Sequence, residues 1–287
     1  MLREALAIQR HLGVRNDRLA VVLGELGWVL FRRLRYDEAD AAFREAVEVA
    51  AAAAGGARQT LAFQTKNWSL MLEELGRDQE AADNQARSLE VRREIYAAPH
   101  EAIHKSEASL ARVLLDLGES ARAAPLVRSA LEGYRATTGE DAPAARLARI
   151  QEVRLMFRTP GIDVAHARQA AEDLIARMEA AEDPALNVAR ARRALGEGLL
   201  LAGQPAPAAA TLRESERLLA ERSPEKHTDR ALSLALLGDA LRSQGEVDQA
   251  IEAYRLSLER FAATVGDRHP RALEVRRQLE ALRDAAR

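Results

Sequence analysis

The sequence contains no cysteine, no long apolar run and few aromatic residues, which are 4% of the 287 positions. Without cysteine the chain can form neither a disulfide nor a thiolate nucleophile. No stretch of about 18 apolar residues is present, so we expect no membrane-spanning helix. The first 30 residues lack the basic start, apolar run and cleavage site of a signal peptide. These absences together favour a cytoplasmic location.

The chain also lacks an excess of either charge. Its 42 basic and 44 acidic residues give a formal net charge of -2, so we expect no direct binding of nucleic acid or of an anionic membrane. The basic residues are almost all arginine, since lysine occurs only at Lys66, Lys105 and Lys226. This bias is typical of GC-rich bacterial genomes and predicts a bacterial origin.

Helix breakers and strand patterns are scarce as well. Nine prolines and sixteen glycines are few for this length, and alanine, leucine, arginine and glutamate are strong helix formers. No segment alternates polar and apolar residues with the period of two that strands require. The composition therefore predicts an all-α fold.

Turn residues recur along the chain at intervals of 42 or 43 residues. Five residues after most of them comes an alanine, and twelve residues before that alanine comes a second small residue. Two small residues so spaced allow two antiparallel helices to approach closely. The turn column is Leu34, Gly76, Gly118, Gly161, Gly203 and Gly245; the first-helix small column is Gly27, Ser69, Ala111, Gly196 and Gly238.

These columns resemble the tetratricopeptide repeat family. The links Thr138-Gly-Glu-Asp-Ala-Pro143 and Val265-Gly-Asp-Arg-His-Pro270 are similar to those of its kinesin-light-chain-like branch, as is the second-helix segment from Gly245 to Tyr254. The resemblance implies a right-handed α-solenoid of helix pairs. It also implies a binding module with neither enzymatic activity nor a cofactor.

The register predicts one solenoid over 1–287. Residues 1–13 align with the second helix of a partial repeat, so we expect the natural protein to be larger. A capping helix is expected at 268–287. Complete repeats are expected at 17–54, 57–97, 100–138, 142–181, 184–222 and 224–264. The fourth repeat is irregular because it contains one extra residue. Depending on the register, its first small site falls at Val153, Arg154 or Leu155, and its second falls at His166. It is a candidate hinge.

One short pattern points to chemistry. His100, Glu101 and His104 match the His-Glu-x-x-His arrangement, which on a helix brings two imidazoles to one zinc ion with the glutamate as general base. A zinc hydrolase is therefore one alternative. The competing interpretation is stronger, because His100 falls at a link where this branch often has histidine. It assigns the motif to a link histidine and a polar helix face at the frayed start of a helix, with no bound metal.

The resemblance implies that first helices line a concave groove that binds a protein or peptide. Asn67 coincides with an asparagine that this branch uses to bond a peptide backbone. The Lys-Asn-Arg ladder of chaperone-binding members is present only in fragments, at Lys66 and Asn67, so an acidic chaperone tail is not expected. By their place in the repeat, the predicted groove residues are Trp28, Arg32, Asn67, Leu70, Arg112 and Asp116.

Two non-enzymatic roles follow from this groove. The first is a scaffold or adaptor for a partner segment. The second is a regulatory sensor arm of a bacterial signalling protein, such as a Ser/Thr kinase or a transcription regulator, in which peptide binding changes the curvature of the solenoid.

Overall fold

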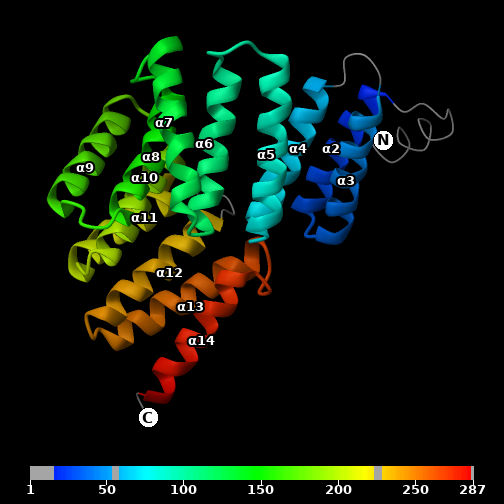
Figure 1. The fold of residues 1–287 in the computed structure, drawn as a ribbon. Coiled ribbons are helices and arrows are strands. Elements are labelled where there is room, and N and C mark those ends of the chain that lie inside the picture. Colours follow the sequence, from blue (N-terminus) through cyan, green and yellow to red (C-terminus); the bar gives the residue numbers. More distant parts are fainter. Residues whose placement is uncertain (1–15, 54–57, 223–227, 286–287) are drawn as a thin grey trace. The chain divides into compact units, whose positions relative to one another are not determined.

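A computed structural model describes residues 16–53, 58–222 and 228–285, and these form thirteen helices and no strand (Figure 1). None of the described helices combines the length and the hydropathy needed to cross a membrane. The predicted helix at 1–13 lies outside the described residues. The helices are α2 (Asp17–Arg32), α3 (Tyr36–Ala52), α4 (Arg58–Glu74), α5 (Asp78–Ile95), α6 (Glu101–Asp116), α7 (Ser120–Thr137), α8 (Pro143–Arg158), α9 (Val164–Ala180), α10 (Ala185–Leu201), α11 (Pro205–Arg222), α12 (Thr228–Ser243), α13 (Val247–Thr264) and α14 (Pro270–Ala285).

The all-α fold of consecutive helix pairs is confirmed. The helices belong to two compact units, one ending at Gly139 and the other beginning at Glu140. The first unit contains three hairpins, α2–α3, α4–α5 and α6–α7, and the second contains α8–α9, α10–α11, α12–α13 and the final helix α14. Whether both units belong to one solenoid stays a prediction.

The six turns share one backbone conformation. Each turn residue of the predicted column has a positive φ, between 59° at Leu34 and 79° at Gly118. Glycine adopts this left-handed region at no steric cost, which is why it occupies five of the six turns. The chain therefore reverses at the predicted places.

The two helices of a hairpin approach closely at the small residues of the first helix, and a large residue of the second helix fills the space there. A Cβ atom at Gly27 would lie 2.8 Å from the Phe43 ring, and one at Gly238 would lie 2.4 Å from the Tyr254 ring. Each large residue follows its glycine by sixteen positions and fills the space that the missing side chain leaves. The second-helix alanines Ala39, Ala81, Ala123, Ala208 and Ala250 are all completely buried.

Serines join the two helices of three hairpins by hydrogen bonds. The hydroxyl of Ser257 donates to the backbone carbonyl of Ala231 at 2.7 Å. Ser88 and Ser215 make the same bond 26 residues back along the chain, at 2.8 and 2.9 Å. The buried hydroxyl is thus satisfied and ties the second helix to the first.

The fourth hairpin departs from the pattern in compensating ways. Arg154 occupies the place of the small residue and is 8% exposed, and its Nε lies 3.4 Å from Oε2 of Glu197 on α10. On α9, Ala171 takes the place of the larger residue that the other hairpins have. In this hairpin the large side chain is therefore Arg154 on the first helix, and the small one is on the second. Ala167, completely buried, fills the second small site, and the neighbouring His166 is exposed. Helices α8 and α9 pack much less closely than the other pairs.

Candidate functional site

The six predicted groove residues lie on the first helices of the three hairpins in the first unit. Trp28 and Arg32 belong to α2, Asn67 and Leu70 to α4, and Arg112 and Asp116 to α6. Figure 1 shows these helices following one another in chain order within the unit. Sequence spacing placed one residue pair on each helix; the structure determines what each side chain contacts.

Trp28 contributes mainly to packing. Its ring meets Phe43 edge-on at 5.3 Å between centroids and Phe31 at 5.8 Å, and Phe43 is completely buried. Trp28 itself is half-buried, and Arg32 donates from Nε to its backbone carbonyl at 3.5 Å. Much of the indole therefore already covers the core of the first hairpin, which leaves one part of it for a partner.

Asn67 is little exposed, at 7%, and its side-chain amide makes no hydrogen bond with the rest of the described chain. Its amide nitrogen and oxygen are not fully enclosed, so they remain free to bond water or the backbone of a ligand. Leu70, three residues later, is half-buried.

Arg112 forms an ion pair with Glu73 that connects α6 to α4. Glu73 also accepts from the Ser69 hydroxyl at 3.3 Å. Burial raises the pKa of Glu73, while the Arg112 cation opposes the shift. The pKa of Asp78 is raised to about 6 by burial and then by the charges of Asp116 and Glu73. Carboxylates therefore crowd this end of α4 and α6.

Three ion pairs between successive first helices share one spacing. Arg158 and Glu197 contact at 2.5 Å and Arg190 and Asp229 at 2.7 Å, and both pairs are 39 residues apart. The pair formed by Glu73 and Arg112 has the same separation. This spacing is about one helical turn shorter than the repeat, so these three pairs of first helices contact each other with a displacement of about one turn.

The same spacing brings together two cations that the sequence interpretation did not select as a pair. Lys66 on α4 and Lys105 on α6 are 39 residues apart. Burial, then Arg92 and then Lys105, lower the pKa of Lys66. Arg92 itself donates to the Ala102 carbonyl at 3.1 Å and to Ser106 at 2.9 Å. The 39-residue separation is evident in the sequence, but that it makes the two lysines neighbours follows only from the displacement of the helices in the structure.

The His-Glu-x-x-His residues have structural partners. The Nδ1 of His100 accepts from the Ala102 amide at 3.1 Å and caps α6, and its ring stacks on Tyr96 at 3.9 Å. His269 does the same at the start of α14, accepting from the Arg271 amide at 3.1 Å. The interpretation of His100 as a link residue agrees with these contacts.

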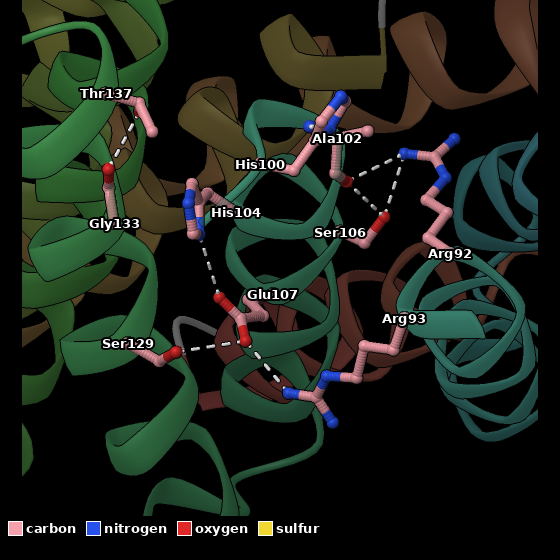
Figure 2. A network of polar contacts seen from close by, with 10 residues as sticks. All are labelled: Arg92, Arg93, His100, Ala102, His104, Ser106, Glu107, Ser129, Gly133 and Thr137. Carbon is pink, nitrogen blue, oxygen red and sulfur yellow. Dashed lines mark hydrogen bonds and ion pairs between the residues drawn. The ribbon is translucent and has the colours of Figure 1, made fainter. Parts of the chain in front are cut away.

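Part of the polar helix face at this motif is buried. His104 is 5% exposed and Glu107 is 2% exposed, because α7 covers them. Figure 2 shows the Glu107 carboxylate meeting Arg93 at 2.8 Å, Ser129 at 3.0 Å and His104 at 3.4 Å. Gly133 leaves the room that the His104 ring fills. Within the described residues, no three His, Cys, Asp or Glu side chains are arranged to bind a metal ion.

Comparison with known proteins agrees with this architecture. The sequence profile described as Tetratricopeptide repeat matches residues 19–58 and 230–271. These two stretches, one in each unit, are similar in sequence to that repeat family. Proteins of this fold are typically binding scaffolds without catalytic activity. No curated protein sequence gives a significant match to this chain.

Solved structures share the fold of this chain at low sequence identity. BtubC (BKLC) from P. vanneervenii is 19% identical with a TM-score of 0.58, over 76% of this chain and 87% of that one. A Rap protein complexed with Competence and Sporulation Factor is 14% identical with a TM-score of 0.58, over 86% and 78%. The apo form of RapI is 14% identical with a TM-score of 0.57, over 91% and 99%.

Proposed function

We propose that this protein binds a peptide segment of another protein along α2, α4 and α6. The observation that supports the proposal most strongly is Asn67, whose amide makes no hydrogen bond in the described part of the chain and is not fully enclosed. A bound peptide backbone offers both the N–H and the C=O that such an amide requires. The resemblance of the sequence to the kinesin-light-chain-like branch assigns this position the same role.

The neighbouring residues suit a peptide ligand. Trp28 and Leu70 are half-buried and offer apolar surface, while Arg32 and Asp116 are exposed and polar. Arg112 forms an ion pair with Glu73, so its main effect is on the charge at the edge of the site, and we do not treat it as a separate contact for the peptide. The proposal takes the protein to be a cytoplasmic scaffold or adaptor of bacterial origin.

Selection of short random linear peptides against the whole chain tests this function. We expect selected peptides to lose affinity by about tenfold when Asn67 is replaced by alanine, because that change removes backbone hydrogen bonds worth about 1.4 kcal/mol. Asn84→Ala is the matched control, since Asn84 is half-buried on the second helix α5 and its amide donates to the Glu80 carbonyl of the same helix. Fluorescence anisotropy of the labelled peptides measures both. Equal affinity of all three proteins would refute the site.

A sensor role is the second candidate. It is supported by the fold shared with the Rap protein, which was solved with Competence and Sporulation Factor bound. The loosely packed fourth hairpin is the place at which we propose that binding changes the curvature. Small-angle scattering with and without a selected peptide tests the sensor role. A changed radius of gyration would support it. Identical scattering curves would contradict it and favour the scaffold role.

A further inference from the structure

The first-helix faces of α4 and α6 form a three-step ladder. Lys66, Leu70 and Glu73 are spaced by four and then three residues, so they lie on one stripe of α4. Lys105, Ser109 and Arg112 have the same spacing on α6. The observed contact of Glu73 with Arg112 fixes the register between the stripes. The steps are therefore Lys66 with Lys105, Leu70 with Ser109, and Glu73 with Arg112.

The first step is basic. Where the ladders of other hairpins place a cation opposite an anion, this step places Lys66 opposite Lys105. Arg92 from α5 adds a third cation near Lys66, while Glu101 forms an ion pair with Lys105 at 2.6 Å. The ammonium of Lys66 lies 5.4 Å from the centre of the Phe63 ring, which is itself 46% exposed. The cluster carries a net positive charge.

The last step has the opposite sign. Glu73 and Arg112 neutralise each other, and Asp78 from α5 and Asp116 from α6 add carboxylates beside them. The separation of the two ends is set by the helix rise, which places Glu73 about 10 Å from Lys66 along α4. Between the ends lie Leu70, which is half-buried, and the unpartnered amide of Asn67.

We infer that the surface formed by Lys66, Lys105 and Leu70 at one end and by Glu73 and Asp78 at the other selects a bipolar peptide. Its acidic residue lies against the two lysines, an apolar side chain lies against Leu70, and a basic residue lies beside the carboxylates. An extended chain rises about 3.3 Å per residue, so the two charges are roughly three to five positions apart. The inference rests on the proposed function, because it specifies the peptide bound at that site.

The peptides selected against the whole chain test the inference directly. We expect enriched sequences to contain an acidic and a basic residue at that separation, with an apolar residue between them. Lys105→Glu should weaken their binding by about tenfold or more, since it replaces attraction by repulsion. Arg87→Glu, on the exposed face of α5, should leave it unchanged. Binding should also weaken as salt is raised.

A charge exchange separates recognition from unfolding. A selected peptide whose acidic residue is changed to lysine should bind the Lys105→Glu protein more tightly than it binds the unchanged protein. Asp78→Lys should respond in the same way to a change of the basic residue to glutamate. Such a gain of binding cannot arise from a damaged fold.

The outcomes distinguish the two proposals. Peptides that depend on Asn67 but show no pairing of opposite charges, or no response to the exchange, would overturn the bipolar inference and leave the proposed function intact. Peptides that bind independently of Asn67, or no enriched peptide at all, would overturn the proposed function and the inference with it.

Discussion

Leu34 adopts the left-handed backbone conformation that glycine adopts at the other five hairpin turns. Its φ of 59° costs an L-residue about 1–2 kcal/mol, and its side chain, 51% exposed, recovers little of this by burial. We expect Leu34→Gly to raise the free energy of unfolding by about 0.5–1 kcal/mol, because glycine relieves the strain but adds entropy to the unfolded chain. Chemical denaturation measures it.

The control for this prediction is Leu34→Ala, which removes the same side chain but keeps the Cβ atom. If the alanine and glycine variants were equally stable, backbone strain at Leu34 would not be the cause.

His269 couples stability to pH. Burial, with a contribution from the Arg271 cation, lowers its pKa to about 4, against about 6.5 in an unfolded chain. The unfolded state therefore takes up the proton first as pH falls. The stabilisation is complete above pH 6.5 and is lost as pH falls towards 4, by about 3 kcal/mol. Protonation also removes the Nδ1 acceptor that caps α14.

We expect His269→Asn to reduce this loss, since asparagine can cap a helix but does not titrate in this range. Unfolding free energies of both proteins from pH 7 to pH 4 provide the measurement. Parallel curves for the two proteins would show that His269 is not the group responsible.

At the scale of helices, the fourth hairpin differs from the rest in how closely it packs. Helices α8 and α9 contact each other much less than α12 and α13 do, and segments with few buried contacts open at lower free-energy cost. We expect backbone amides of α9 to exchange with deuterium about tenfold faster than those of α13. Both helices belong to the second unit, so each is a control for the other. Equal protection would argue against a weak point at this hairpin.

Helix positions were predictable because the sequence repeats the features that determine them. The turn glycines, the buried alanines and the small residues opposite Phe43 and Tyr254 all obey one period, since each hairpin solves the same packing problem. In the fourth hairpin, which has one extra residue, the buried alanine is Ala167, one position after His166, where the repeat spacing placed it. The sequence did not determine which residue fills its first small site. Arg154 fits there because Ala171 on α9 is small and Glu197 on α10 pairs with it, and neither residue belongs to the columns of small residues.

Surface chemistry was less predictable, because it depends on how neighbouring hairpins are displaced. The 39-residue spacing of ion pairs differs from the repeat period, so Lys66 and Lys105 fall in different repeat columns and are not seen as neighbours. The burial of His104 and Glu107 depends on α7 and on Gly133, which lie outside the short motif itself. Asn67 was singled out by resemblance, and its low exposure and the lack of a hydrogen bond to its amide in the described residues became visible only in the folded chain.

For the whole molecule, the central claim is that the first helices of the first unit bind a peptide. Photo-crosslinking of a selected peptide to the intact chain, mapped by mass spectrometry, tests this most directly. The account predicts cross-links to α2, α4 and α6, concentrated at Trp28, Asn67, Leu70 and Lys105, and their loss in the Asn67→Ala variant. Cross-links confined to the second helices α3, α5 and α7, or to the second unit, would contradict it.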